Sequence, residues 1–225
     1  MADPAPRIPW VMILAAGAAA IAVLASIYLL QPKPPAETET ETASANAPVG
    51  CVLSPGKQIG GPIDLIDESG AAVTQKHFNE GMSLVYFGYT FCPDVCPLSL
   101  QAEKKALDLV GQEAGVIQPV MISLDPERDT PQTLAAYVKS DGFPNGLIGL
   151  TGSKDQVAAA AKAFRIVYKR IDDPKSAAGY TVGHSSYFYL MDDEWRARAL
   201  YPSTLSPHDA AQCIKAGIAQ TSPSN

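Results

Sequence analysis

A run of 21 residues without a charged side chain, from Trp10 to Leu30, constrains this 225-residue chain more than any other feature. At about 1.5 Å per residue, a helix of this length crosses the hydrocarbon core of a bilayer. A secretory signal peptide has a shorter apolar stretch with a small-residue cleavage site close behind it. Here a proline-rich segment follows, and the nearest Ala-x-Ala is distant, at Ala43–Ala45. We therefore expect an uncleaved transmembrane anchor over residues 10–30, in preference to a signal peptide.

The segments beside this run predict the domain organisation. Residues 1–9 form a short tail. The positive charges of Arg7 and the free N-terminus slightly exceed the single charge of Lys33 on the other side of the apolar run, which favours a cytoplasmic N-terminus. Residues 31–49 are rich in Pro, Ala, Thr and Glu and predict a flexible, solvated linker. An Arg-rich transit peptide has no room before residue 10. We expect a single-pass protein of the bacterial inner membrane with residues 50–225 as a periplasmic domain.

The composition excludes several classes of protein. Hydrophobic residues make up 47% and charged residues 18%, and the net charge of −6 gives a pI near 5.0. These values exclude a disordered chain, a collagen and a basic nucleic-acid-binding protein. A domain the size of residues 50–225 buries roughly 70% of its unfolded surface, so it needs no disulfide merely to hold a core. The four cysteines need another explanation.

Apolar patterns predict alternating strands and helices in this domain. The order is strand, helix, strand, helix, strand, helix, then a hairpin and a last helix, which predicts parallel central strands. We therefore expect an α/β sandwich of the thioredoxin type, with a central mixed sheet flanked by helices. The predicted strands are 83–87, 120–124, 147–150, 187–191 and 197–201, and the predicted helices span 98–110, follow Thr130-Pro131, span 157–164 and follow Ser206-Pro207.

Two cysteines lie where the first of these strands gives way to its helix. Cys92 and Cys96 are four residues apart at a helix start, so they share one face with Cβ atoms roughly 5 to 6 Å apart. They can close a disulfide or bind one soft metal ion. The positive end of the helix favours the thiolate form, and Asp94 opposes it. A purely structural disulfide is disfavoured because it would close almost no loop.

Three segments resemble the Sco/SenC family when taken together and in this order: YTFCPDVCP at 89–97, DPERDTP at 125–131 and VGHSS at 182–186. The resemblance covers roughly residues 55–215. It implies a membrane-anchored, thioredoxin-like copper protein that takes part in assembling cytochrome c oxidase, with Cys92, Cys96 and His184 as the copper ligands. Two thiolates and one imidazole form a soft donor set that suits Cu(I), and three ligands leave the ion exchangeable.

Other polar residues near these segments have two interpretations each. Asp125 and Asp129 follow a buried strand, where they either orient His184 or contact a partner, or else serve the turn and the helix cap. Arg128 offers positive charge to an acidic partner or forms a salt bridge within its own loop. The polar residues 172–179 predict a mobile loop before His184.

The remaining cysteines and histidines lie outside the family motifs. Cys51 and Cys213 lie at the two ends of the domain, where they either form a disulfide that clamps the N-terminal extension to the last helix or remain separate thiols. We exclude both from the metal site. We expect structural roles for His77 and His208.

Two functions use the same cysteines. The first is a copper chaperone, not an enzyme, that binds Cu(I) or Cu(II) through Cys92, Cys96 and His184 and delivers it to the dinuclear CuA centre of cytochrome c oxidase subunit II. The second is a membrane-tethered thiol-disulfide reductase that keeps the copper-ligating cysteines of the oxidase reduced, with Cys92 attacking and Cys96 resolving. Only the first requires His184. Either function implies a periplasmic thioredoxin-like reductant or copper donor as a partner.

Two further alternatives are weaker. Peroxide reduction or redox signalling is one of them, but the chain lacks the usual sequence around a peroxidatic cysteine, since Gly88 and Tyr89 precede Thr90 here. Zinc suits a Cys-Cys-His site chemically, but the resemblance argues for copper.

Overall fold

The computed structural model describes residues 51, 53, 58–78, 80–175 and 178–220, which all belong to the compact unit Glu41–Asn225. The predicted tail, anchor and linker lie outside the described residues. Within the described part of the chain, no helix is both long and apolar enough to cross a membrane.

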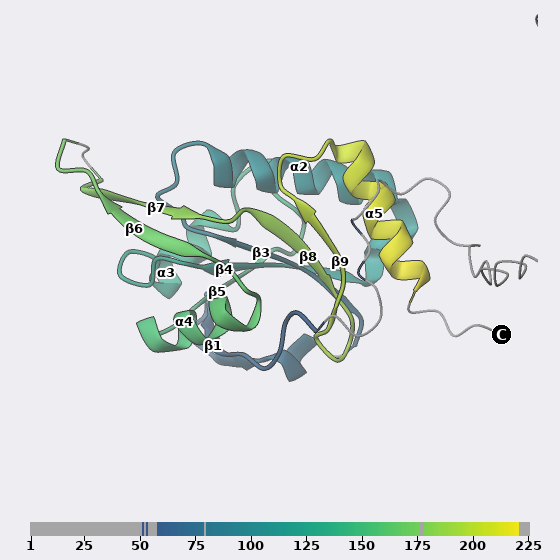
Figure 1. Ribbon diagram of the computed structural model, residues 1–225, viewed down its shortest axis with the longest axis horizontal. Coiled ribbons are helices and arrows are strands. Elements are labelled where there is room, and N and C mark those ends of the chain that lie inside the picture. The colour runs from purple at the N-terminus through teal and green to yellow at the C-terminus, as the bar shows by residue number, and fades with distance from the viewer. Residues whose placement is uncertain (1–50, 52, 54–57, 79, 176–177, 221–225) are drawn as a thin grey trace, which may run out of the picture. The chain divides into compact units, whose positions relative to one another are not determined.

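A seven-stranded mixed sheet forms the centre of the described domain (Figure 1). In spatial order its strands are β2 (Ala72–Thr74), β1 (Asp64–Asp67), β5 (Ile148–Thr151), β4 (Ile117–Ser123), β3 (Met82–Gly88), β8 (Tyr187–Met191) and β9 (Ala197–Pro202). The central strands β3, β4 and β5 run parallel, and the pairs at both edges are antiparallel. Every residue of β3 is buried, as expected for a parallel strand covered on both faces.

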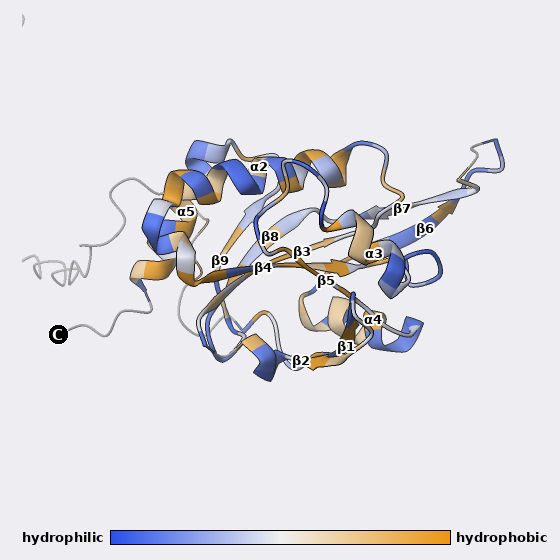
Figure 2. Ribbon diagram, turned by 180° about the vertical axis from the view of Figure 1, so that it is seen from behind, coloured by the Kyte–Doolittle hydropathy of each residue, from blue (hydrophilic) through white to orange (hydrophobic). Residues whose placement is uncertain are grey.

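Helices cover both faces of this sheet. The helices α2 (Val95–Val110) and α5 (Pro207–Ala219) lie side by side on one face, and α4 (Lys154–Ala163) lies on the other (Figures 1 and 2). The short helix α3 (Pro131–Tyr137) packs on β5, where a Cβ atom at Gly149 would lie only 3.2 Å from Leu134 Cβ. The described residues also include the 3-10 helices η1 (Gln75–Phe78) and η2 (Gly111–Val116). This architecture confirms the predicted α/β sandwich.

Alternate side chains of β3 build the core on opposite faces of the sheet. Tyr86 stacks on Phe188 with ring centroids 4.8 Å apart. Its neighbour Phe87 packs against Phe164, at the end of α4, with centroids 5.1 Å apart. Figure 2 shows the hydrophobic residues concentrated on these central strands. Because successive side chains of a strand point to opposite faces of the sheet, the buried strand β3 contributes to the core on both faces.

Local capping signals fix where two of the helices begin. The Thr130 side chain accepts a hydrogen bond from the Thr133 backbone N–H, and Pro131 occupies the first helical position. Ser206 accepts from the Asp209 backbone N–H in the same way, ahead of Pro207. Both starts were predicted from the sequence, because a hydroxyl followed by proline satisfies the helix start without help from distant residues.

A separate antiparallel hairpin, β6 (Tyr168–Asp172) and β7 (Tyr180–His184), extends beyond the edge of the main sheet (Figure 1). The prediction of a loop over all of 172–179 is wrong at its start, because Asp172 pairs with Tyr180 in this hairpin. The strand β6 was not predicted because four of its five residues are exposed and give no apolar run. The hairpin places His184 at the last position of β7.

Cys51 and Cys213 form a disulfide, which confirms one of the two predicted alternatives. Their Cα atoms lie 5.7 Å apart although 162 positions separate them in the sequence. The Leu200 N–H donates to the Cys51 carbonyl, and the Leu53 N–H donates to the Arg198 carbonyl. The disulfide therefore ties a segment that lies along β9 to the helix α5.

Replacing Cys51 and Cys213 together by serine should lower the free energy of unfolding by about 5 kcal/mol. The reason is that the unfolded chain regains the freedom that a very long closed loop removes. Urea denaturation of the oxidised proteins measures the change. Replacing the half-buried Cys92 by serine is the control, which should leave the midpoint close to that of the wild type. Equal midpoints for all three proteins would contradict the prediction.

Glu103 is a buried acid within α2. It is 2% exposed, and neither carboxyl oxygen has a hydrogen-bond partner among the described residues. Burial raises the pKa of this carboxyl well above its usual range, because an ionised carboxylate there would lose its hydration without compensation. The folded domain therefore keeps Glu103 protonated at a pH where the unfolded chain has released that proton.

Glu103→Gln should stabilise the domain increasingly as the pH rises. The unfolded pKa is about 4.3, so the wild type is unaffected below that pH and loses up to about 1.4 kcal/mol per pH unit above it, until the raised folded pKa is reached. Glutamine stays neutral and avoids this loss. Thermal unfolding of both proteins between pH 4 and pH 8 measures the difference. A difference that does not depend on pH would contradict the prediction.

Candidate metal centre

The two free cysteines lie where β3 leads into α2. Cys96 is fully buried in the first turn of α2, and Cys92 is half-buried in the preceding loop. The Cys96 backbone N–H donates to Cys92 Sγ at 3.3 Å, so one of the unpaired amides of the helix start points at that sulfur. A Cβ atom at Gly88 would lie 3.1 Å from Cys96 Sγ and 2.7 Å from the Tyr86 ring. Glycine at the end of β3 therefore leaves room for the Cys96 thiol.

His184 brings a third donor to the same place. Its Nε2 lies 3.8 Å from Cys96 Sγ, and its Nδ1 lies 3.0 Å from the Ser185 carbonyl oxygen. Because a carbonyl only accepts, Nδ1 carries the proton and the Nε2 lone pair faces the thiol. The rings of Tyr86 and Tyr89 contact the imidazole edge-on, with centroids 6.3 Å and 6.2 Å away. These contacts fix the orientation of the imidazole.

The structure thus brings together Cys92, Cys96 and His184, the three residues predicted as ligands. The separation of 3.8 Å between Cys96 Sγ and His184 Nε2 is close to the roughly 3.6 Å spanned by two donors on one ion at typical protein metal–ligand bond lengths. Nowhere in the described residues do three or more His, Cys, Asp or Glu side chains already form a closed metal-binding group. Two donors are therefore in place, and Cys92 lies beside them on the solvent side.

The two thiols differ strongly in acidity. A hydrogen bond with the Cys96 thiol, helped by the backbone N–H groups of Cys96 and Asp94, lowers the pKa of Cys92 to about 5. The same hydrogen bond and burial raise the pKa of Cys96. Cys92 is therefore the thiolate at neutral pH, and Cys96 keeps its proton until a metal or a disulfide takes its place. The backbone N–H of Asp94 thus supports the thiolate, whereas the opposing effect of the Asp94 side chain stays a prediction.

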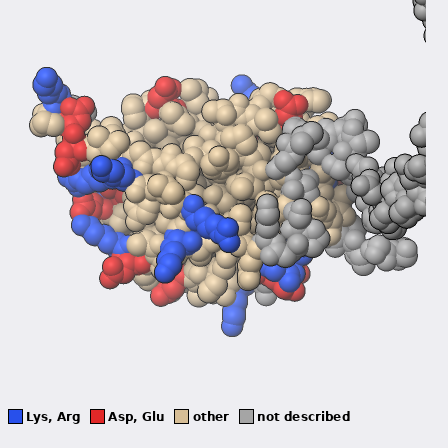
Figure 3. Space-filling model, in the orientation of Figure 1, with Lys and Arg blue, Asp and Glu red and all other residues tan. Residues whose placement is uncertain are grey.

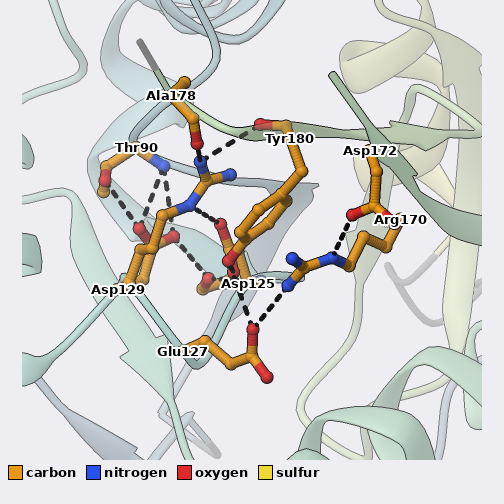
Figure 4. Close-up of polar contacts among 10 residues, drawn as sticks. Thr90, Asp125, Glu127, Asp129, Arg170, Asp172, Ala178 and Tyr180 are labelled. Atoms are coloured by element: carbon orange, nitrogen blue, oxygen red, sulfur yellow. Dashed lines mark hydrogen bonds and ion pairs between the residues drawn. The ribbon is translucent and has the colours of Figure 1, made fainter. Parts of the chain in front are cut away.

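Asp129 fixes the loop that precedes Cys92. Its carboxylate is fully buried and accepts hydrogen bonds from the Thr90 hydroxyl at 2.6 Å, the Thr90 N–H at 3.1 Å and the Ser123 hydroxyl at 2.5 Å (Figure 4). Burial raises the pKa of this carboxyl despite these bonds. Among the described residues Asp129 forms no hydrogen bond with His184, whose ring nitrogens face Cys96 and Ser185, so it does not orient that histidine through a hydrogen bond, and the contact with a partner stays a prediction.

Asp125 lies in the same loop and also forms no hydrogen bond or ion pair with His184 among the described residues. Its carboxylate accepts from the Tyr180 hydroxyl at 2.7 Å and pairs with Arg128 at 2.5 Å (Figure 4). The side chain of Arg128 is only 15% exposed. Of the two predicted roles of Arg128, the structure therefore confirms the salt bridge within its own loop.

Three exposed apolar side chains surround the Cys92 loop, and sequence reasoning did not find them. Phe91, Val95 and Leu98 are 49%, 49% and 57% exposed. Nothing in their local sequence separates them from core residues, because a helix start carries apolar side chains on several faces. By contrast, positive and negative side chains gather together over the projecting end of the β6–β7 hairpin (Figure 3).

The other two histidines lie in turns of their own. His77 is exposed in η1, and its Nδ1 accepts from the Thr74 backbone N–H at 3.0 Å. His208 is exposed in the first turn of α5, 3.6 Å from the Asp209 carboxylate. Both positions agree with the structural roles predicted for them.

Comparison with known proteins finds one family. The family model described as SCO1/SenC matches residues 53–219. Protein SenC of Rhodobacter capsulatus is 40% identical over 161 residues, which cover 72% of this chain and 71% of that protein. Protein sco1 of Schizosaccharomyces pombe is 39% identical over 161 residues, 70% of this chain and 60% of that protein. The chain thus spans less than two thirds of the length of that yeast relative.

Solved structures give the same result. The structure of Arabidopsis thaliana ScoI with copper bound superposes with a TM-score of 0.67 at 37% identity, over 72% of this chain and 99% of that one. Bradyrhizobium japonicum ScoI with copper bound has a TM-score of 0.61 at 38% identity, over 70% and 98%.

Cys92 should be alkylated by iodoacetamide at a rate that is half-maximal near pH 5 and constant above pH 7. The rate follows the thiolate fraction, and the pKa of Cys92 is lowered to about 5. Buried Cys96 should not react in the folded protein. Mass spectrometry of peptides from a pH series locates and times the modification.

The matched control is Cys96→Ala, which removes the main cause of the lowered pKa and should move the half-maximal rate toward higher pH. A wild-type rate that still rises between pH 8 and pH 9 would contradict the prediction.

Proposed function

The chain belongs to the SCO1/SenC family, and we propose that it is a copper chaperone that binds Cu(I) through Cys92, Cys96 and His184. The observation that carries the proposal is the approach of His184 Nε2 to within 3.8 Å of Cys96 Sγ, with the Nδ1 proton held by Ser185. Two thiolates and an imidazole form a soft set suited to Cu(I). The A. thaliana and B. japonicum relatives were solved with copper bound.

Copper is the cargo of this site, and each donor has its own part in binding it. Cys92 is half-exposed and already a thiolate, so it meets the ion first. Cys96 gives up its proton as it binds, since a coordinating thiol is deprotonated. His184 comes from a different element from the thiols and completes the set. We propose Cu(II) as a second state that the same residues bind.

The position of the site beside an exposed apolar surface bears on how copper would be delivered. We propose that the acceptor is the dinuclear CuA centre of cytochrome c oxidase subunit II. The description of one solved relative, 21% identical, names the Sco family of cytochrome c oxidase assembly proteins. The exposed side chains of Phe91, Val95 and Leu98 give a partner an apolar surface beside Cys92 that excludes water during transfer.

The apolar run in the sequence supports a location for this domain. We propose that residues 10–30 anchor the chain in the bacterial inner membrane and that residues 31–49 are a flexible linker. The domain from residue 50 then lies in the periplasm, where it can reach a membrane-bound acceptor.

A thiol-disulfide reductase is the second candidate, because the half-exposed Cys92 thiolate can act as the attacking nucleophile. In that reaction the Cys92 thiolate attacks one sulfur of a substrate disulfide and releases the other as a thiolate. Cys96 then loses its proton, attacks Cys92 Sγ and releases the second substrate thiol, so the pair is oxidised by two electrons. A periplasmic thioredoxin-like partner would reduce the pair again. His184 has no part in this reaction.

Anaerobic titration of the fully reduced Cys92/Cys96 pair with Cu(I) against a competing chelator separates the two functions. We expect one tight equivalent, and His184→Ala should weaken it by at least about tenfold, the effect seen even for residues that only support a metal ligand. His77→Ala is the control and should leave the affinity unchanged. Affinity independent of His184, together with rapid reduction of a disulfide substrate, would replace the chaperone by the reductase.

A further inference from the structure

We infer that Arg128 is a positioning residue, which holds the hairpin that carries His184 against the loop that carries Cys92. The inference rests on the proposed function, because it requires His184 to be a copper ligand. It adds to that function the residue that decides whether the third ligand stays in reach of the thiols.

The side chain of Arg128 binds backbone carbonyl groups at the start of β7. Its Nε donates to the Asp125 carboxylate at 2.5 Å, and its Nη1 donates to the carbonyl oxygens of Ala178 at 3.0 Å and Tyr180 at 3.1 Å. Figure 4 shows these bonds converging between the loop after β4 and the hairpin. One nearly buried guanidinium therefore joins the two segments.

Tyr180 is held at three points by the same ion pair. Its carbonyl accepts from Arg128, its hydroxyl donates to Asp125 at 2.7 Å, and its ring lies 3.6 Å from the guanidinium carbon. A planar guanidinium can stack on a ring and donate in its own plane at once, which an ammonium group cannot. The first residue of β7 is therefore fixed in both position and orientation.

Arg128 also reaches the sulfur side of the site. Its guanidinium carbon lies 4.7 Å from the centre of the Phe91 ring and 5.9 Å from that of Tyr89. Phe91 immediately precedes Cys92, and Tyr89 contacts the His184 ring. The loop of Arg128 thus touches both the thiol-bearing loop and the histidine-bearing strand.

The hairpin needs such support because it pairs with no strand of the main sheet in the described part of the chain. A two-stranded hairpin alone is marginally stable in water. Tyr180 and Val182 are its buried anchors. Among the described residues, the ion pair that links the hairpin directly to the domain is Arg170 with Glu127, whose side chains are 50% and 41% exposed, so its contribution is weak. Loss of Arg128 should let His184 move away from Cys96 while both thiols stay in place.

Arg170 provides a matched control on the same ring. Its guanidinium carbon lies 3.5 Å from the Tyr180 ring centre, as near as that of Arg128. Among the described residues its hydrogen-bond and ion-pair partners are the exposed carboxylates of Glu127 and Asp172, and none of these partners is a backbone group of β7. A cation on the ring is common to both arginines, whereas the bonds to the β7 backbone belong to Arg128 alone.

The test compares Cu(I) affinity of the full chain with those of Arg128→Gln, Arg128→Lys and Arg170→Gln, each also made in a His184→Ala background. We expect Arg128→Gln to weaken binding about tenfold and Arg128→Lys to weaken it less. Arg170→Gln should remain within about twofold of the wild type. In the His184→Ala background Arg128→Gln should cause no further loss, because it acts through that histidine. Hydrogen exchange of the β7 amides in the copper-free proteins should speed up for Arg128→Gln and not for Arg170→Gln.

Several results would overturn the inference. Equal affinity of Arg128→Gln and the wild type would do so, and so would a tenfold loss that persists without His184. If Arg128→Gln does not fold, the test relies on Arg128→Lys. Cu(I) affinity and β7 hydrogen exchange equal to those of the wild type in Arg128→Lys would then contradict the inference. Wild-type binding that does not depend on His184 at all would instead remove the proposed function, and the wild-type and His184→Ala measurements show this separately.

Discussion

The parallel pairing of β3 with β4 is the constraint on which the rest of the site depends. Parallel strands end at the same edge of a sheet, so the loop after Gly88 and the loop after Ser123 emerge side by side. The Leu124 N–H donates to the Gly88 carbonyl at 2.8 Å and joins the two loops at their first residues. Asp129 can then bind Thr90, two residues before Cys92, because both have left the sheet at one place.

The site combines donors from parts of the domain that differ in how firmly they are held. Cys96 belongs to a helix packed on the main sheet, whereas His184 ends a hairpin outside that sheet. Regions that must move in binding are drawn from the less stable parts of a fold. In the proposed function, the thiol pair would therefore keep its place while binding of the ion depends on the position of His184. The loop of Asp125, Arg128 and Asp129 controls both parts, since it bonds to the thiol-bearing loop and to the hairpin.

Local signals in the sequence predicted those elements whose cause is itself local. The buried runs of β3 and β4 and the hydroxyl-proline caps at Thr130 and Ser206 needed no distant partner, and the structure confirms them. The strand β6 was not predicted, because its residues are mostly exposed and form no apolar run. The hydrogen-bond partner of Asp125 was not predicted either, since Tyr180 lies 55 positions away in the sequence. His184 entered the candidate site through family resemblance alone, because a lone histidine at a strand end carries no local metal signal.

The hydrogen bonds at the thiol pair also bear on the choice between the two functions. They stabilise the Cys92 thiolate, which lowers its pKa to about 5 and therefore favours the reduced form of the pair over the disulfide. A pair with a stabilised reduced form accepts electrons readily and gives them up reluctantly. This tendency opposes a reductase, which must pass its electrons to another protein. It supports copper binding, which needs both sulfurs reduced even where Cys51 and Cys213 are oxidised to a disulfide. The same hydrogen bonds, from the Cys96 thiol and the backbone N–H groups, that stabilise the Cys92 thiolate thus favour the reduced state in which the site can bind copper.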